Sequence, residues 1–312
     1  VLRTLSRVTR SILIEALGVP MALDLKGLTD AEATAVRDAW RDAAVTSRAS
    51  AAEPATMRVR EPEDAAEFAE VMERLSQRVT VEAITARRAD LWMLHAAGLA
   101  LPDGRVLVLV GPSGRGKTTA SRALGATLGY VSDETVAIDR DGRVWPYRKP
   151  LSIIETPGRP KAQRAPSSLG MAPLPRAPLR LAGIVLLDRR ADAGDSPVVE
   201  AIDLGDALEE LVAQSSFLPT LDRPLRTMAA HVTAVGGVHR VRYREAATLV
   251  AIVDRLVREP GAVVRGGTEG SGVAGSSRSD EVAWYRGEVL DEVALDDPDR
   301  IALLQVDEAG EG

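Results

Sequence analysis

The sequence contains no cysteine, and this absence removes several classes of chemistry. It excludes disulfides, thiolate metal sites, iron–sulfur clusters and a cysteine nucleophile. Histidine is nearly as scarce, since the chain has only His95, His231 and His239, and we therefore expect no histidine-rich metal site. A catalytic metal in this protein would be a hard ion bound through oxygen atoms.

Long apolar runs and aromatic residues are also lacking. No apolar run approaches the ~20 residues that cross a bilayer, and no signal-peptide pattern opens the chain, so we expect a cytoplasmic protein without membrane contact. Aromatic residues make up 3% of the sequence. The net charge of −6 is concentrated in residues 280–312, which hold eleven acidic residues and two arginines. The rest is only weakly basic, so we expect no nucleic-acid partner.

The composition is that of a folded globular protein, and the sequence contains one highly specific motif. Hydrophobic residues make up 45% of the chain and charged residues 27%, as in ordinary globular proteins. Lysine occurs four times, and Lys117 completes the phosphate-loop pattern G-x-x-x-x-G-K-[ST] between a predicted strand at 105–110 and a predicted helix at 118–128. The nucleotide-binding residues that we expect are Gly111, Pro112, Ser113, Gly114, Arg115, Gly116, Lys117, Thr118, Thr119 and Arg148.

The chemistry of that motif is specific. Its glycines let backbone N–H groups converge on phosphate oxygens, and the following helix adds the positive end of its dipole. Lys117 is expected to bridge the β and γ phosphates, and Thr118 to bind Mg²⁺. We therefore expect a nucleoside triphosphate as ligand and Mg²⁺ with it.

Phosphoryl transfer also needs a carboxylate, and the chain offers two candidates. A helix of about eleven residues descends ~16 Å from the loop, and the extended residues 129–133 climb back ~16 Å, so Asp133 and Glu134 return to the phosphate end. Asp188 closes the apolar run 181–187 in the manner of a Walker B strand. No L-S-G-G-Q-like signature precedes Asp188, so we favour the pair Asp133 and Glu134.

These residues together resemble a known family. The segments His95-Ala-Ala-Gly, the phosphate loop, Tyr130-Val-Ser-Asp-Glu134 and Tyr147-Arg-Lys-Pro150 are similar to the HPr serine kinase/phosphorylase group, and to its HPr-kinase-related relatives within the PEP-carboxykinase-like P-loop fold. The likeness covers about residues 88–200. It implies that His95 assists Asp133, which takes the proton from a serine hydroxyl.

The sequence departs from that family in two places. The family usually shows two aspartates where this chain has Asp133 and Glu134, so the roles of base and metal ligand stay open between these two residues. The first 85 residues do not look like the receiver part of the true HPr kinases, and we therefore do not expect HPr itself as substrate.

The predicted fold class is α/β, with a P-loop nucleotide-binding core of the HPr kinase/PEP carboxykinase-like type and a small N-terminal α+β region. We predict four parts: the α+β region at 1–87, the kinase core at 88–260, a Gly/Ser-rich linker at 261–279 and an acidic tail at 280–312. The tail contains β-prone runs at 282–285 and 301–306, which are similar to the opening hairpin of PqqD-like peptide-binding modules.

Local signals predict several element boundaries. Thr29 and Glu32 form a capping box before a helix, and Pro62 is expected in the first turn of a second helix. Gly129 is expected to cap the helix after the phosphate loop, and an Asp-Gly turn at 141–142 to join a hairpin. The basic, proline-rich stretch 150–175 is expected to form a lid. Residues 232–243 are expected to form a strand, and 246–257 a last helix.

The function predicted from the sequence is an ATP-dependent kinase that transfers the γ-phosphoryl group to a hydroxyl with Mg²⁺. The acceptor is a Ser or Thr of a protein or peptide, or a small molecule. We assign Asp133, His95 and Lys117 to catalysis, and Thr118, Asp133 and Glu134 to the metal. The alternatives are a nucleotide hydrolase that uses Asp188, and a nucleotide-sensing module without turnover. A homo-oligomer and the choice among ATP, GTP and pyrophosphate stay open.

Overall fold

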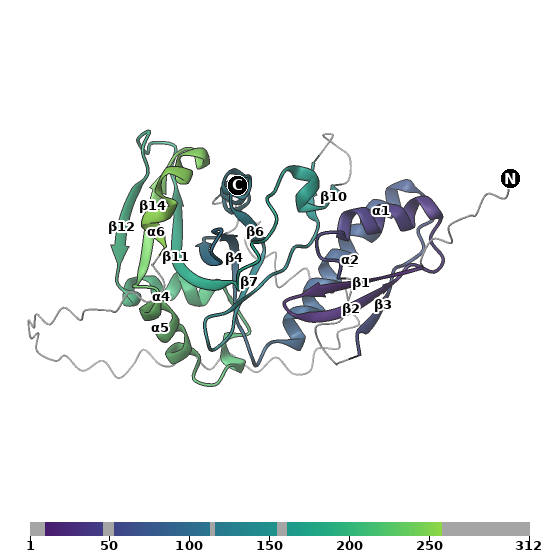
Figure 1. Ribbon diagram of the computed structural model, residues 1–312, viewed down its shortest axis with the longest axis horizontal. Coiled ribbons are helices and arrows are strands. Elements are labelled where there is room, and N and C mark those ends of the chain that lie inside the picture. Colours follow the sequence, from purple (N-terminus) through teal and green to yellow (C-terminus); the bar gives the residue numbers. More distant parts are fainter. Residues whose placement is uncertain (1–9, 46–52, 113–115, 155–160, 258–312) are drawn as a thin grey trace, which may run out of the picture. The chain divides into compact units, whose positions relative to one another are not determined.

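The computed structural model describes residues 10–45, 53–112, 116–154 and 161–257. These residues form a mixed α/β arrangement with three sheets and six α-helices (Figure 1). They belong to one unit, which runs from Val1 to Val264. The predicted linker and acidic tail at 261–312 lie outside the described residues. Within the described part, no helix is both long and apolar enough to cross a membrane.

The N-terminal part is a three-stranded sheet with two helices. Strands β1 (Ser11–Ala16) and β2 (Val19–Asp24) form an antiparallel hairpin, and β3 (Ala55–Arg58) runs parallel to β2. Helices α1 (Asp30–Trp40) and α2 (Ala65–Ala86) pack against this sheet (Figure 1). Apolar residues of all five elements belong to one hydrophobic cluster. This shared core holds the sheet and the two helices together as one α+β layer pair.

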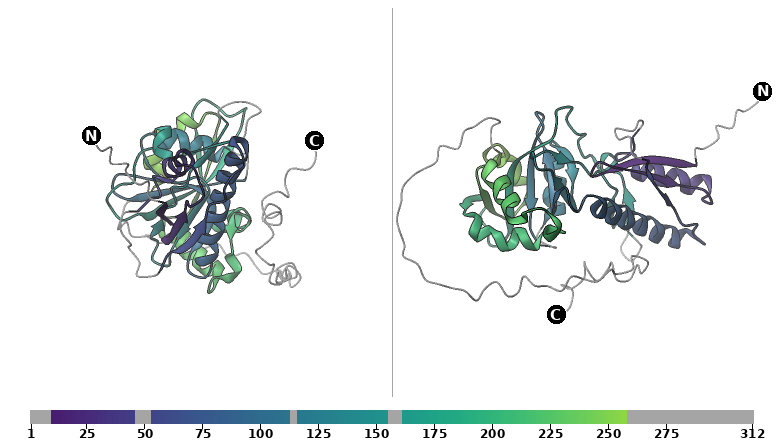
Figure 2. Two further views of the ribbon diagram at one scale, coloured as in Figure 1. Left: turned by 90° about the vertical axis from the view of Figure 1, so that its right-hand side faces the viewer. Right: turned by 90° about the horizontal axis from the view of Figure 1, so that it is seen from below.

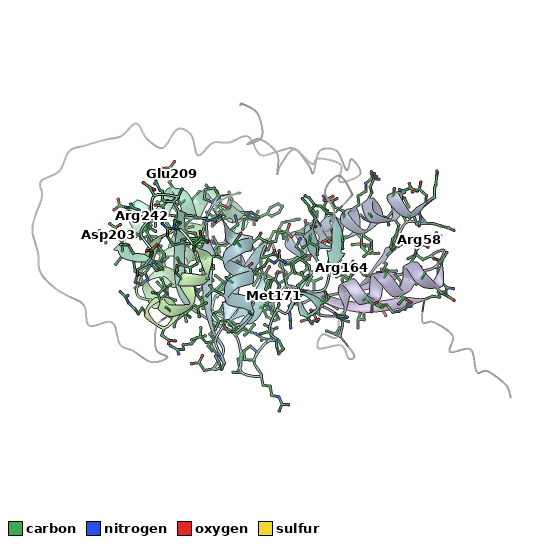
Figure 3. All side chains as sticks on the ribbon, turned by 90° about the horizontal axis from the view of Figure 1, so that it is seen from above. Arg58, Arg164, Met171, Asp203, Glu209 and Arg242 are labelled. Atoms are coloured by element: carbon green, nitrogen blue, oxygen red, sulfur yellow. The ribbon has the colours of Figure 1, made fainter. Side chains whose placement is uncertain are left out.

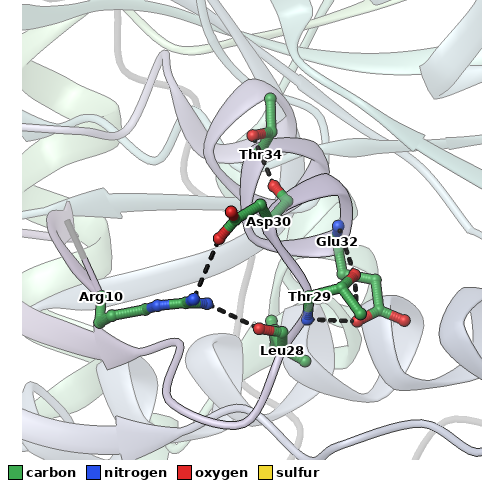
Figure 4. A network of polar contacts seen from close by, with 6 residues as sticks. All are labelled: Arg10, Leu28, Thr29, Asp30, Glu32 and Thr34. Atoms are coloured by element: carbon green, nitrogen blue, oxygen red, sulfur yellow. Dashed lines mark hydrogen bonds and ion pairs between the residues drawn. The ribbon is translucent and has the colours of Figure 1, made fainter. Parts of the chain in front are cut away.

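The capping box predicted for α1 is confirmed. The Thr29 hydroxyl accepts a hydrogen bond from the Glu32 backbone N–H at 3.3 Å, and the Thr29 N–H donates to the Glu32 carboxylate at 2.8 Å (Figure 4). Arg10 adds an ion pair to Asp30 at 3.0 Å. The prediction for α2 was wrong at its start: Asp64 is the cap, so Pro62 precedes the helix, because the Asp64 carboxylate satisfies two free N–H groups.

The largest sheet has nine strands in the order β12-β14-β11-β5-β4-β7-β8, with β6 and β13 also paired to β4. Its strands are β4 (Trp92–Ala100), β5 (Arg105–Val110), β6 (Gly129–Ser132), β7 (Thr135–Ile138), β8 (Val144–Trp145), β11 (Arg180–Arg189), β12 (Val198–Ile202), β13 (Ser215–Ser216) and β14 (Val238–Tyr243). The predicted hairpin at the Asp-Gly turn is confirmed as the antiparallel pair β7–β8.

Three strands of this sheet, β5, β11 and β14, run parallel, and their carboxyl ends lie at one edge. Val110 at the end of β5 pairs with Leu186, and Arg189 at the end of β11 pairs with Tyr243. Ligands of open α/β sheets bind outside the carboxyl ends of such strands. The edge at which β5 meets the glycine-rich motif is therefore the place where a site is expected.

Helices cover both faces of the large sheet. Helix α3 (Lys117–Gly125) and helix α6 (Val253–Leu256) contribute to one hydrophobic cluster. Helices α4 (Leu204–Ala213) and α5 (Pro224–Ala234) contribute to another (Figure 2). The sheet is thus buried on both sides, in agreement with its continuous apolar strands.

Three boundaries differ from the sequence-based predictions. Helix α3 ends at Gly125 with Ala126 as its cap, and Gly129 instead begins β6, because residues 129–132 pair with β4. Residues 232–234 end helix α5, so the predicted strand starts only at Val238. The last predicted helix is a 3₁₀ helix over Ala246–Ile252 followed by one α-helical turn, α6.

The stretch 150–175 holds short elements rather than one open loop. Strands β9 (Leu151–Ile153) and β10 (Ala162–Arg164) form an antiparallel pair, and a 3₁₀ helix spans Pro166–Leu169. Residues 155–160, including Arg159 of the predicted basic lid, lie outside the described residues. Strand β10 packs against α1 and α2, whereas Leu151 and Met171 pack with Tyr130.

The capping box of α1 gives a first testable prediction. Thr29→Ala removes the oxygen that accepts from the Glu32 N–H, and we expect the free energy of unfolding to fall by about 1 kcal/mol. Urea denaturation followed by circular dichroism measures this change. Thr29→Ser keeps the hydroxyl and is expected to keep the stability. Equal stability of the alanine and serine variants would contradict the role of the cap.

Candidate functional site

The glycine-rich motif lies at the junction of β5 and α3. Gly116 is the residue before α3 and has a φ of 91°, a left-handed conformation that favours glycine. No side chain of the described residues caps α3, and its first turn holds no acidic residue. The free N–H groups and the helix dipole at this end favour an anion. Ser113, Gly114 and Arg115 of the motif lie outside the described residues, whereas Thr118 and Thr119 are exposed on the first turn of α3.

Lys117 turns back onto the start of the motif. Its ammonium group donates hydrogen bonds to the carbonyl oxygens of Gly111 and, at 3.2 Å, of Pro112. The residue is 7% exposed. Burial lowers the pKa of Lys117 to about 8, and the negative charge of Asp133 acts in the opposite direction. The motif lysine and Asp133 are therefore close enough to interact, as the sequence reasoning required.

Asp133 follows β6 and is held by a tyrosine. The Tyr130 hydroxyl donates to Asp133 Oδ1 at 2.7 Å. Burial raises the pKa of the Asp133 carboxyl group, while the Lys149 charge and the Tyr130 hydrogen bond oppose this rise. A carboxylate with a raised pKa is a stronger base. Tyr130 was not predicted from the sequence as a partner of Asp133. It lies three residues before Asp133, and only the turn after β6 brings its hydroxyl to the carboxylate.

Glu134 and His95 complete the same group. Glu134 forms an ion pair with Lys149, which follows β8. His95 lies on β4 opposite Thr135 of β7. Burial and the Lys117 charge lower the pKa of His95, while Glu134 acts in the opposite direction, and the imidazole is neutral at pH 7. The structure thus brings His95, Asp133 and Glu134 together near the motif lysine, and it adds Lys149 to this group. Thr118 follows Lys117 on the first turn of α3.

Arg148, which the sequence predicts to bind the nucleotide, is instead engaged by protein groups. Its side chain is 10% exposed, forms an ion pair with Asp42 at 3.8 Å and donates to the Ala172 carbonyl at 3.3 Å. Burial lowers the pKa of Arg148, and the Asp42 charge opposes this. Asp42 also accepts a hydrogen bond from the Ser167 N–H at 2.6 Å. Arg148 therefore links the end of α1 to the segment after β8, beside the expected site.

Asp188, the other carboxylate considered from the sequence, lies on β11 two residues beyond the partner of Val110. Both of its oxygens are engaged: Arg190 donates at 2.7 Å and Arg242 (labelled in Figure 3) at 3.4 Å. Burial raises the pKa of Asp188, but the two arginines together bring it below its usual value. Asp188 is an ionised carboxylate already paired with two cations.

The oxygen donors near Lys117 suit one kind of metal complex. Among the described residues, no group of three histidine, aspartate or glutamate side chains gathers as a metal site. Mg²⁺ is commonly held by one or two carboxylates together with phosphate oxygens and water. Thr118, Asp133 and Glu134 therefore fit a magnesium–nucleotide complex better than a metal bound by protein alone.

The electrostatic coupling of Lys117 and Asp133 gives a second prediction. The chain has four lysines, so their ¹³Cε signals are few enough to follow in an NMR titration. We expect the Lys117 signal, assigned by its loss in Lys117→Arg, to titrate near pH 8. Asp133→Asn removes a charge that stabilises the ammonium form, so the midpoint is expected to move to lower pH. An unchanged or higher midpoint in Asp133→Asn would contradict the coupling.

The buried ion pair of Asp42 and Arg148 gives a third prediction. Asp42→Ala leaves the Arg148 charge without its partner and removes the acceptor of the Ser167 N–H, so we expect a loss of about 2–4 kcal/mol of stability. Urea denaturation measures this loss. Asp38→Ala, at an exposed position of α1 just before Asp42, is the control and is expected to change stability by less than about 0.5 kcal/mol. Similar losses in both variants would refute the link.

Comparisons with known proteins do not assign this site. No protein-family model matches the chain, and no curated protein matches its sequence. The function is therefore argued from the site itself: a buried motif lysine, a carboxylate of raised pKa beside it, and an uncapped helix start at the edge of a mixed sheet.

Proposed function

We propose that this protein is an ATP-dependent kinase that transfers the γ-phosphoryl group to a hydroxyl acceptor with Mg²⁺. The observation that carries the proposal is the position of the motif lysine, whose buried ammonium group bonds to the carbonyls of Gly111 and Pro112 at the start of α3, where the charge of Asp133 acts on it. Phosphoryl transfer requires groups that hold the phosphates and a carboxylate beside the acceptor. Both requirements are supported by residues that lie within one small group.

In the proposed reaction, Asp133 takes the proton of the acceptor hydroxyl. The hydroxyl oxygen forms a bond to the γ-phosphorus, the bond from that phosphorus to the β–γ bridging oxygen breaks, and ADP leaves with the electron pair. Lys117 and the N–H groups at the start of α3 hold the phosphates in line. Mg²⁺, held by Thr118 and the adjacent carboxylates, supplies charge neutralisation when it is bound.

The different partners of the two carboxylates support a division of roles. Asp133 accepts from the neutral Tyr130 hydroxyl and has a raised pKa, which suits a base. Glu134 is paired with the Lys149 ammonium, and its carboxylate oxygens suit a ligand of Mg²⁺. His95, neutral through burial, lies beside both Lys117 and Glu134 and helps to hold this arrangement.

The fold and the acceptor belong to the same proposal. The junction of β5 and α3 supports a P-loop core, and the likeness to HPr-kinase-related proteins favours the PEP-carboxykinase-like type. A Ser or Thr hydroxyl on a protein or peptide is the preferred acceptor, with a small-molecule hydroxyl as the other option.

A nucleotide hydrolase is the second candidate. The observation that favours it is the position of Asp188 on β11, beside the strand that leads into the motif. In that reaction water replaces the acceptor and Asp188 acts as the Walker B acid. The ion pairs of Asp188 with Arg190 and Arg242 weigh against it, because they occupy both carboxylate oxygens.

A fourth prediction separates these two reactions. With γ-labelled ATP, Mg²⁺, peptides that carry Ser or Thr, and small hydroxyl compounds, we expect label on an acceptor and none with Lys117→Met. Asp133→Asn is expected to lower the transfer rate by about 10²–10⁴-fold, the usual contribution of a general base. Asp188→Asn and the exposed control Asp141→Asn are expected to keep the rate. Label that appears only as free phosphate, with loss of activity in Asp188→Asn, would support the hydrolase and overturn the kinase.

A further inference from the structure

Tyr243 has a buried hydroxyl for which the described residues provide no hydrogen-bond partner. The residue ends β14, is 0% exposed, and packs its ring in the cluster that includes α3. Nearly all buried hydroxyl groups in folded proteins are hydrogen-bonded, because an unpaired one loses its bonds to water without compensation. A hydroxyl left in this state points to a missing partner.

The Tyr243 hydroxyl lies next to Gly116, the residue before α3. A Cβ atom built on Gly116 would lie 2.9 Å from Tyr243 Oη and 3.2 Å from Arg189 Cδ. The Tyr243 hydroxyl therefore lies directly against the residue that precedes α3. Strand register explains how it gets there, since Arg189 and Tyr243 pair at the carboxyl ends of two parallel strands. Tyr243 and Arg189 thus reach the start of α3 from strands outside the motif.

Two independent features meet at this point. One is the start of α3, a helix of nine residues that no described side chain caps and whose dipole favours an anion at this end. The other is the buried Tyr243 hydroxyl. A phosphate at neutral pH offers oxygen acceptors, and a phenol supplies the donor that they need. A tyrosine carries its proton at neutral pH, and burial raises the pKa of Tyr243 further, although the Arg189 charge opposes this rise.

We infer that the Tyr243 hydroxyl donates a hydrogen bond to the phosphate group held at the start of α3, and that Tyr243 is a nucleotide-binding residue outside the glycine-rich motif. This inference rests on the proposed nucleotide-binding function. It adds β14 to the site, because the residue that recognises the phosphate lies two strands away from β5. It also explains the unpartnered hydroxyl, which gains its partner when the phosphate binds.

The test is the isosteric variant Tyr243→Phe in the full chain, with thermal unfolding and calorimetric titration of two probes, ATP and inorganic triphosphate, each with Mg²⁺. Without a probe we expect the Tm of the variant to equal or exceed that of the wild type, because the hydroxyl has no partner to lose. With either probe we expect affinity to fall about tenfold, the effect of removing one hydrogen bond to a charged group.

Tyr147→Phe is the matched control. The Tyr147 hydroxyl is buried and bonded to the Thr80 hydroxyl at 2.8 Å, in the hydrophobic cluster of the N-terminal part. We therefore expect this variant to have a lower Tm without a probe and an unchanged affinity for both probes. The two tyrosine variants thus have opposite signatures, which a general loss of packing would not produce.

The possible outcomes distinguish a failure of the proposed nucleotide-binding function from a failure of the inference about Tyr243 alone. A wild-type protein that binds neither ATP nor triphosphate would overturn the proposed function and this inference with it. A wild-type protein that binds both, with equal affinity in Tyr243→Phe, would overturn the inference alone. A deficit with ATP but not with triphosphate would place Tyr243 away from the phosphates and would also overturn it. Equal losses for both probes, with the Tm retained, would support it.

Discussion

The candidate site depends on the burial of one ammonium group. Lys117 is nearly inaccessible to solvent, and burial lowers its pKa to about 8, while the charge of Asp133 opposes the fall. In place of water, the ammonium group has the carbonyl oxygens of Gly111 and Pro112. A buried cation is stable only where such acceptors exist. The end of β5 supplies the carbonyls of Gly111 and Pro112, and the turn after β6 supplies Asp133. These two segments must therefore lie close to α3 for the Lys117 ammonium to be buried stably. A bound polyphosphate would offer the same ammonium group further negatively charged oxygen atoms.

Much of this arrangement could be predicted from the sequence, because the signals that indicate it come from residues close together in the chain. A strand, a glycine-rich turn and a helix follow one another without a gap, and the distance from Lys117 to Asp133 could be estimated from helix rise and strand length. The boundaries at Pro62 and Gly129 were wrong for two different reasons. Near Pro62 a second local signal prevails, because the Asp64 carboxylate caps the helix two residues later. At Gly129 a tertiary contact prevails, because the residue pairs with β4.

The partners of the charged groups could not be predicted in the same way. Glu134 pairs with Lys149 across a hairpin, and Arg148 pairs with Asp42 over more than a hundred residues of sequence. Neither pairing leaves a pattern in a single sequence, since a salt bridge requires only two opposite charges that the fold happens to bring together. The sequence left the roles of Asp133 and Glu134 open, and the proposed division of roles rests only on the different partners of the two carboxylates.

The same contacts make the N-terminal part a structural support for the site. The segment after β8 is tied to it at three successive residues: Pro146 accepts from the Leu17 N–H at 3.3 Å, Tyr147 bonds to Thr80, and Arg148 pairs with Asp42. Lys149 is the next residue, and it pairs with Glu134. The position of the Lys149 ammonium is thus fixed by a body that contributes no residue to the glycine-rich motif. The Pro146 hydrogen bond and the Arg148 ion pair lie on either side of Tyr147, so they hold Lys149 in place even where the Tyr147 hydroxyl is removed.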